Sequence, residues 1–246
     1  MQLLPRLKPD SAFLANTLLS KGEVPQWATY EMQKKVKQEA SDLIDFYLKR
    51  KAGYDLYLAA SLRCLEDFMR AEQVVSFLEK NLHISIVHPG GLGISLDTPE
   101  KDSSNEKGDL ERFFLDRSST LLMIDAEKAT WGKYAEAMTM LLRQMQVVMY
   151  TEDKSTAFIL KERHPLKTLG GFGGSCGYHV VTSLGEILTC LKWSLTICKM
   201  DSCSEKQVNG ADGQRRAYNS YCPNCGSLIR RTSFWISNKR KKVNKQ

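Results

Sequence analysis

Six of the seven cysteines lie in the last third of the chain, and four of them have the spacing of metal ligands. Cys198 and Cys203 are separated by four residues; eighteen residues later, Cys222 and Cys225 belong to a Cys-Pro-Asn-Cys-Gly turn. Such a turn directs two thiolates at one point, and its glycine tolerates the backbone geometry required. Two converging pairs give tetrahedral coordination by four sulfurs, which suits zinc and leaves no position for water. We therefore expect these four cysteines to hold one structural Zn²⁺.

The residues around the four cysteines have the pattern of short strands. Residues 218–221 lead into the second turn and residues 227–236 lead out of it. Within the predicted strand 187–198, which ends at the first cysteine, apolar and polar side chains alternate over residues 191–197. Over about residues 187–236 the chain therefore resembles a zinc ribbon, in which a closed zinc site holds two β-hairpins together.

The first pair of ligands is less strictly defined than the second. Its spacing of four residues exceeds the commoner two, so Cys190 or His179 could replace Cys198. The cysteine count is odd and the first ten residues contain no extended apolar run. Both features favour metal binding in a reducing compartment over a disulfide framework in a secreted protein.

The positive charge of the chain is concentrated in the same region. The net charge is +7; from Lys161 onward there are 15 basic and five acidic residues, against 20 basic and 23 acidic before it. Basic side chains neutralise phosphates, and aromatic rings stack on unpaired bases. The interleaved aromatic residues are Tyr218, Tyr221, Phe234 and Trp235. The expected phosphate contacts are Arg215, Arg216, Arg230, Arg231, Lys239, Arg240, Lys241 and Lys242.

These features together predict a non-catalytic zinc-ribbon protein that binds DNA or RNA in a nuclear complex or in gene regulation. The basic run 239–242 is also typical of a nuclear localisation signal, with the cytoplasm as the alternative location. A second hypothesis is an adaptor subunit that contacts a protein partner through its N-terminal helices. No apolar run approaches the roughly 20 residues that span a bilayer, so we expect no membrane association.

A third hypothesis is a metal-dependent nuclease. Asp125 and Glu127 follow one predicted strand, Glu152 and Asp153 follow the next, and Asp97 is a further candidate. Carboxylates at the carboxyl ends of neighbouring parallel strands can hold Mg²⁺ for phosphodiester cleavage. In this respect the segment resembles PIN- or NYN-like nucleases, with Asp125, Glu127 and Asp153 as the metal-binding carboxylates.

The helices and strands predicted from the sequence indicate an α+β fold whose N-terminal region is helical. We expect one helix from Ser11 toward Gly22 and a second from about Trp27 toward Gly53. A third would carry Leu58, Leu62, Leu65 and Met69 on one stripe and run to about Lys80, packing on the second as an antiparallel hairpin. Residues 1–82 thus form a helical region.

The middle and rear regions have more strand character. Residues 83–165 predict a small α/β region, with strands 84–87, 120–124 and 146–150, a helix over 126–145 and an exposed loop over 97–108. Residues 166–237 predict the β-rich zinc-ribbon region, followed by a basic tail over 238–246. The remaining predicted elements are strands 157–160, 178–182 and 187–198 and a glycine-rich loop over 167–177.

Overall fold

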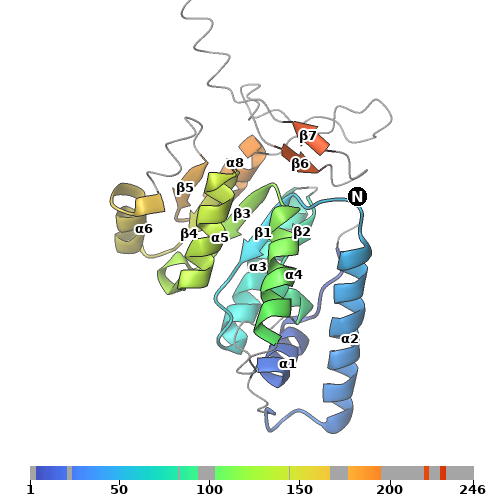
Figure 1. Ribbon diagram of the computed structural model, residues 1–246. Helices are drawn as coiled ribbons and strands as arrows, with labels where there is room; N and C mark the ends of the chain where they lie inside the picture. The colour runs from blue at the N-terminus through green and yellow to red at the C-terminus, as the bar shows by residue number, and fades with distance from the viewer. Residues whose placement is uncertain are drawn as a thin grey trace, which may run out of the picture.

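A parallel β-sheet with helices on both faces forms the centre of the computed structural model (Figure 1). The structure describes residues 4–20, 24–82, 84–93, 103–143, 145–166, 177–194, 219–221 and 228–230. It is a mixed helix-and-strand protein, as expected. The α/β organisation that the sequence predicts for the middle region also extends to both sides of it.

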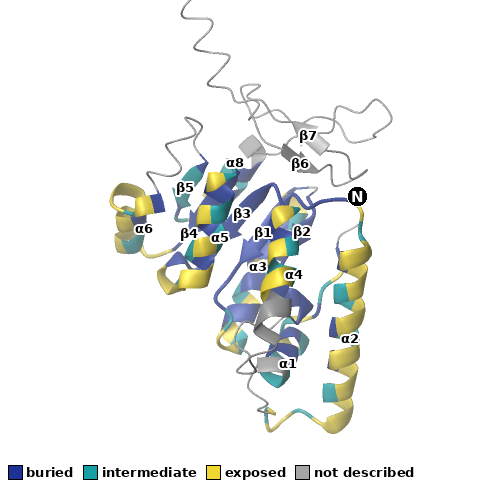
Figure 2. Cartoon of the chain, viewed as in Figure 1, coloured by how far each residue is buried: buried dark blue, intermediate teal, exposed yellow. Residues whose placement is uncertain are grey.

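The five strands of the sheet are ordered β2-β1-β3-β4-β5, and every neighbouring pair is parallel. Their bounds are Leu56–Ala59 (β1), Ile86–Val87 (β2), Thr120–Met123 (β3), Gln146–Tyr150 (β4) and Tyr178–Val181 (β5). Every residue of β1, β3 and β4 is buried, so these strands carry continuous apolar runs in place of an alternating pattern. Figure 2 shows them as the buried centre of the molecule.

Among the described residues, four helices pack on one face of the sheet. They are α2 (Tyr30–Lys49), α4 (Ser103–Asp116), α5 (Trp131–Leu142) and α6 (Lys154–Glu162). Tyr47 of α2 and Phe114 of α4 meet edge to face with ring centroids 6.0 Å apart. Met140 of α5 and Leu160 of α6 extend the same cluster over β3 and β4. This face holds the larger aromatic core.

Two helices pack on the opposite face. They are α3 (Leu65–Asn81), which follows β1, and α8 (Leu184–Ser194), which follows β5. Val74 of α3 and Ile187 of α8 lie in one cluster with Leu122 and Val148 of the central strands. The chain therefore crosses over both faces of the sheet, which is the arrangement of doubly wound α/β folds.

The first helix, α1 (Pro9–Ser20), packs against α2, α3 and the 3-10 turn Pro89–Leu92. Gly93 ends that turn with a positive φ of 77°. A Cβ at this position would lie 2.9 Å from the Cβ of Ala15 in α1 and 3.0 Å from the Cβ of Ala40 in α2. Only glycine satisfies both the backbone conformation and this close approach.

The predicted third helix is wrong over its first residues. Leu58 lies in the buried strand β1, and the helix begins at Leu65. A strand that is buried on both faces lacks the alternation of polar and apolar residues that identifies most strands. The apolar residues of β1 therefore match the spacing of a helical stripe by chance. The predicted helical hairpin is wrong for the same reason, since β1 separates α2 from α3 and pairs with both β2 and β3.

Two predicted strands are helices. Residues 157–160 lie in α6, which begins directly after its N-cap Asp153. Most of the predicted strand 187–198 lies in α8, where Ile187 and Leu191 are buried one turn apart. The apolar positions of this segment satisfy both periods, and packing against the sheet selects the helix.

The strand–helix–strand prediction for the middle region is confirmed. β3 and β4 are parallel and α5 connects them, although a 3-10 turn, Ala126–Lys128, precedes that helix. The predicted strands 84–87 and 178–182 are confirmed as β2 and β5. The predicted loop 97–108 is wrong over residues 103–108, which begin α4, and its residues 97–102 lie outside the described part.

A separate two-stranded antiparallel sheet lies in the region for which the sequence predicts a zinc ribbon. It consists of β6 (Asn219–Tyr221) and β7 (Leu228–Arg230), with Tyr221 opposite Leu228. This backbone pairing confirms strands on either side of the Cys-Pro-Asn-Cys-Gly turn. The four predicted zinc ligands themselves, Cys198, Cys203, Cys222 and Cys225, lie outside the described residues.

Candidate functional site

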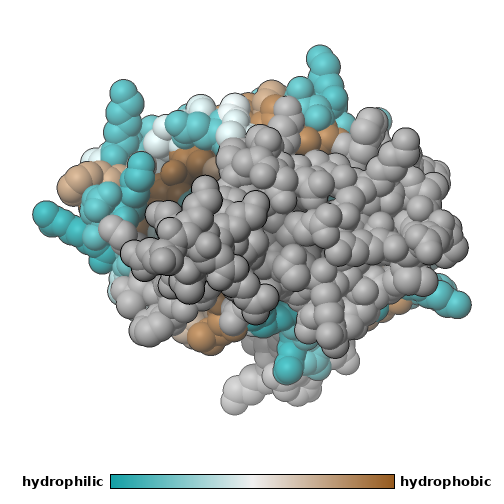
Figure 3. Space-filling model, turned by 90° about the horizontal axis from the view of Figure 1, so that it is seen from above, coloured by the Kyte–Doolittle hydropathy of each residue, from teal (hydrophilic) through white to brown (hydrophobic). Residues whose placement is uncertain are grey.

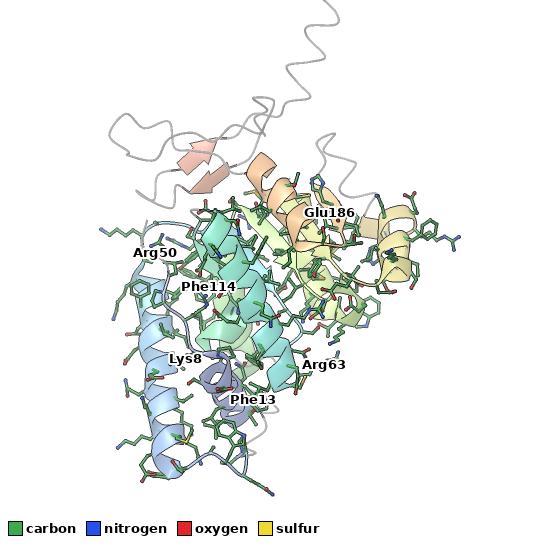
Figure 4. The ribbon with its side chains drawn as sticks, turned by 180° about the vertical axis from the view of Figure 1, so that it is seen from behind. Lys8, Phe13, Arg50, Arg63, Phe114 and Glu186 are labelled. Atoms are coloured by element: carbon green, nitrogen blue, oxygen red, sulfur yellow. The ribbon has the colours of Figure 1, made fainter. Side chains whose placement is uncertain are left out.

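The topology of the sheet marks one position where ligands bind in folds of this kind. β1 leads into α3 on one face, whereas β3 leads into α5 on the other, so the connections diverge at the carboxyl ends of these neighbouring strands. In open α/β sheets, ligands bind at such a divergence. Figure 4 shows which end of the sheet this is. Arg63, which follows the carboxyl end of β1, lies toward α1 and Phe13, whereas Arg50, which precedes β1, lies at the opposite end of the molecule.

A cavity of about 850 Å³ opens from this position and runs between α4 and α5. It is referred to below as the α4–α5 cavity. Its volume lies in the range of small-molecule sites, and its walls combine apolar strand residues with several ionisable groups. The lining residues that matter for chemistry are Tyr57, His88, Glu111, Lys133 and Glu136.

Glu136 is the group in this cavity best suited to proton transfer. It lies on α5, and its Oε1 accepts a hydrogen bond of 2.9 Å from the Tyr57 hydroxyl of β1. Its Oε2 has no hydrogen-bond partner among the described residues. Burial raises the pKa of Glu136 to about 7, and the nearby Glu111 carboxylate raises it too, against the lowering effect of Tyr57. A carboxyl group with this pKa can both donate and accept a proton near neutral pH.

Tyr57 holds Glu136 in place from the floor of the cavity. Burial raises the pKa of Tyr57 well above its ordinary value, so the phenol remains protonated and can only donate to the carboxylate. Its ring belongs to the aromatic-rich core, which fixes the position of the hydroxyl. The pair therefore joins a rigid strand to a titratable side chain on the facing helix.

His88 approaches the cavity from the end of β2. It is only 6% exposed, and its Nε2 has no hydrogen-bond partner among the described residues. Burial and, to a smaller extent, the positive charge of Arg6 lower the pKa of His88 to about 4. The imidazole is therefore neutral at physiological pH and offers a ligand one donor and one acceptor nitrogen.

A second cluster of charges lies at the carboxyl ends of β3 and β4. Asp125 is fully buried, with a left-handed φ of 52°, and its Oδ1 lies 2.8 Å from Nε of Arg70 on α3. Arg70 also reaches Glu152 at 3.4 Å and lies over the Tyr150 ring. Burial raises the pKa of Asp125 although Arg70 opposes this. The arginine thus ties α3 to the ends of two strands.

The carboxylates that the nuclease hypothesis assigns to one metal site lie in surroundings that differ from one another. Asp153 caps α6 by accepting hydrogen bonds from the backbone N–H groups of Ser155 and Thr156. Glu127 is exposed in the 3-10 turn after β3, and Asp97 lies outside the described residues. Within the described part of the chain, no group of three or more His, Cys, Asp or Glu side chains is arranged to hold a metal ion.

Most residues predicted to contact nucleic acid are not described. Arg230 lies in β7, and the alternative zinc ligands His179 and Cys190 lie on β5 and α8. The predicted contacts outside the described residues are Arg215, Arg216, Arg231, Lys239, Arg240, Lys241 and Lys242. The zinc-ribbon expectation and the nucleic-acid interface therefore stay predictions.

Sequence reasoning missed the residues of the α4–α5 cavity. Lys133 and Glu136 are three apart near the start of a helix that follows a buried strand, a spacing that places both on one helix face. That signal gains meaning only when Tyr57 is assigned to a parallel strand facing the same helix. Because β1 was read as helix, the pair could not be placed together.

Comparisons with known proteins identify no related site. Searches against protein-family models, curated proteins and solved structures found no match for the chain. Among the described residues, no helix has both the length and the apolar character needed to cross a membrane.

Proposed function

We propose that this protein is an enzyme that binds a small polar molecule in the α4–α5 cavity and uses Glu136 to transfer a proton to or from it. The observation that supports this most is the Glu136 carboxyl group, with one oxygen held by Tyr57 and the other facing no protein partner among the described residues. Its raised pKa makes it effective in proton transfer near neutral pH.

The position of the cavity supports the same proposal. It opens at the point where the connections from β1 and β3 diverge, and it is of the size that small ligands need. The side chains come from β1, the end of β2, α4 and α5, so rigid elements hold them. Such preorganisation favours catalysis over a merely structural role for the polar groups.

A screen for bound ligands tests this proposal. A library of neutral, anionic and cationic small molecules is screened by ligand-observed NMR, and each hit is incubated with the protein in D₂O and followed for chemical change or deuterium incorporation. We expect at least one hit whose conversion depends on pH with a midpoint near 7, the pKa of Glu136: conversion rises with pH where Glu136 accepts the proton and falls where it donates it. The conversion should be lost in Glu136→Gln, because the amide does not ionise near neutral pH and cannot act as a general acid or base.

The matched control is Glu31→Gln, which removes an exposed carboxylate from the first turn of α2. This variant should convert the ligand at the wild-type rate. Conversion that survives Glu136→Gln unchanged would contradict the assigned role, and a screen without any ligand that the cavity binds would contradict the proposed function as a whole.

A second proposal concerns the C-terminal region, where the β6–β7 hairpin surrounds the Cys-Pro-Asn-Cys-Gly turn. We infer that a zinc ribbon there binds DNA or RNA, with a nuclear location, because the basic excess lies in the same segment. Neutralising Arg230 and Arg231 should weaken binding and reduce its salt dependence. An unchanged affinity in a salt-titrated binding assay would contradict this interface.

A further inference from the structure

Lys133 is a buried lysine whose ammonium group forms no direct ion pair with any described residue. It lies in the first turn of α5, is only 6% exposed and lines the α4–α5 cavity. Its Nζ donates a hydrogen bond of 3.1 Å to the hydroxyl of Ser61. No carboxylate of the described residues lies within ion-pair distance of it. A buried ammonium without a counter-ion is costly, which makes this position unusual for a purely structural lysine.

Ser61, the hydrogen-bond partner of Lys133, also makes a hydrogen bond to the protein backbone. The Ser61 hydroxyl donates its proton to the backbone carbonyl of Lys128 at 2.7 Å, so its lone pairs face Lys133. One neutral acceptor satisfies one of the three N–H donors of the ammonium. Burial lowers the pKa of Lys133, and Arg63 lowers it too, whereas the more distant carboxylates of Glu136, Asp67 and Glu111 raise it without forming an ion pair.

The backbone around Lys133 also presents donors to the cavity. Thr130, the N-cap of α5, makes no side-chain capping hydrogen bond, and Thr130 and Gly132 both line the cavity. The first N–H groups of a helix carry partial positive charge and bind anions when no cap satisfies them. In contrast, the side chain of Thr29 caps α2 by accepting from the N–H of Met32.

A second polar residue lines the same cavity. His88 is nine-tenths buried, and its Nε2 has no hydrogen-bond partner among the described residues. Buried polar atoms are almost always hydrogen-bonded, so an imidazole of this kind indicates a ligand group that completes it. Lys133 and His88 thus both line the cavity that the ligand would occupy.

We propose that Lys133 and the first turn of α5 bind an anionic group, a phosphate or a carboxylate, of the small molecule that the α4–α5 cavity takes. This inference rests on the proposed function, because it assigns the chemical class of the ligand for the same site. The anion supplies the missing counter-ion of Lys133, and the remainder of the ligand extends toward His88 and Glu136.

Amide NMR titrations of the full chain test the inference. Sodium phosphate and sodium acetate are added in separate arms, with sodium chloride at matched ionic strength as the reference. We expect phosphate or acetate to shift the amide signals of Thr130 and Gly132 saturably, and the arm with the stronger effect identifies the anion. The amides of Tyr30 and Glu31, at the capped start of α2, should respond no more than they do to chloride.

Lys133→Met and Lys161→Met form the matched pair of variants. Lys161 is exposed on α6, so its loss removes the same charge without touching the cavity. Lys133→Met should weaken anion binding roughly tenfold or more, since it removes a charged hydrogen-bond donor. Lys161→Met should change it by less than about twofold. The dispersed amide spectrum of each variant verifies that it is folded.

Equal anion binding by Lys133→Met and wild type, or shifts confined to other parts of the spectrum, would overturn the inference. If the two anions leave Thr130 and Gly132 unshifted while neutral molecules from the ligand screen bind the cavity, the inference fails and the proposed function stands. Failure of both experiments contradicts the proposed function as well.

Discussion

Glu136 and Tyr57 form a pair in which each residue has one function. Tyr57, on a central strand, is fixed by the core and can only donate, while Glu136 titrates near neutral pH because burial disfavours its charge. Neither residue belongs to a sequence motif. The carboxyl group acquires its chemistry from the strand opposite it, and sequence spacing alone does not reveal that.

His88 should make the protein sensitive to acid. Its pKa of about 4 lies below the ordinary 6.5 because burial and the positive charges of Arg6 and Lys133 lower it, against the raising effect of the Glu72 carboxylate. Since the unfolded chain binds this proton more readily, stability should fall as pH decreases from 6.5 to 4, by up to about 3 kcal/mol. Urea unfolding across this window should have a smaller pH dependence in His88→Gln. An identical dependence in both proteins would contradict the buried, neutral imidazole.

Arg70 should matter more to stability than an exposed ion pair of the same kind. Arg70→Met leaves the buried Asp125 carboxylate without its partner and should cost about 3 kcal/mol at neutral pH. The control Lys35→Met breaks the exposed pair with Glu39 and should cost less than about 0.5 kcal/mol. Adding Asp125→Asn to Arg70→Met should restore part of the loss. Equal free energies of unfolding for the two single variants would disagree with this assignment.

At the scale of elements, the turn after β2 joins the N-terminal helices to the sheet. The N–H of Leu7 donates to the carbonyl of Gly91, and Arg6 pairs with Glu72 and Glu79 of α3. Gly93 then lies against both α1 and α2. This turn also carries His88 toward the cavity, so the packing of the two N-terminal helices supports one wall of the candidate site.

Gly93→Ala should therefore destabilise the protein by about 1–3 kcal/mol, through its positive φ and its contacts with Ala15 and Ala40. Gly108→Ala is the control of opposite sign. A Cβ there meets nothing within 4 Å, and alanine favours the helix by up to about 1 kcal/mol. Thermal unfolding measures both. A Gly93→Ala variant as stable as wild type would show that α1 and α2 do not dock closely on this turn.

How well the sequence predicts each helix or strand depends on whether polar residues mark its boundaries and its exposed face. Strands β3 and β4 and the helix between them could be predicted because clear polar boundaries separate an apolar strand, an amphipathic helix and a second strand. β1 could not, since Leu58 matches the period of the helix that follows. The local sequence predicts strands within α6 and α8 because it carries no information about the sheet. Both helices form where Leu160 and Leu191 pack on that sheet. The cavity depended on β1 and was missed with it.

At the scale of the whole molecule, two candidate activities lie in different parts of the chain. The α4–α5 cavity belongs to the parallel sheet and its helices, whereas the predicted zinc ligands and most basic residues follow α8. A small-molecule site and a nucleic-acid-binding module are compatible in one protein. Their separation in sequence allows each to be removed while the other is measured.

Zinc removal should affect the C-terminal region alone. We expect one zinc per chain by elemental analysis and its loss in Cys222→Ser, because closed four-cysteine sites obtain their folding energy from the metal. The amide signals of β1, β3 and β4 should be unchanged in this variant. Retention of zinc by Cys222→Ser would contradict the ligand assignment, and unfolding of the parallel sheet would contradict its independence from the metal.

The ionisation of Glu136 is the measurement that tests the central claim most directly. Glutamate labelled with ¹³C at the side-chain carboxyl gives one signal per residue, and Glu136→Gln assigns the signal of interest. The predicted titration midpoint is near pH 7, well above the ordinary 4.5. A midpoint near 7 supports a carboxyl group prepared for proton transfer in the α4–α5 cavity. A midpoint near 4.5 would mean that Glu136 is an ordinary solvated carboxylate, and the proposed chemistry would be wrong.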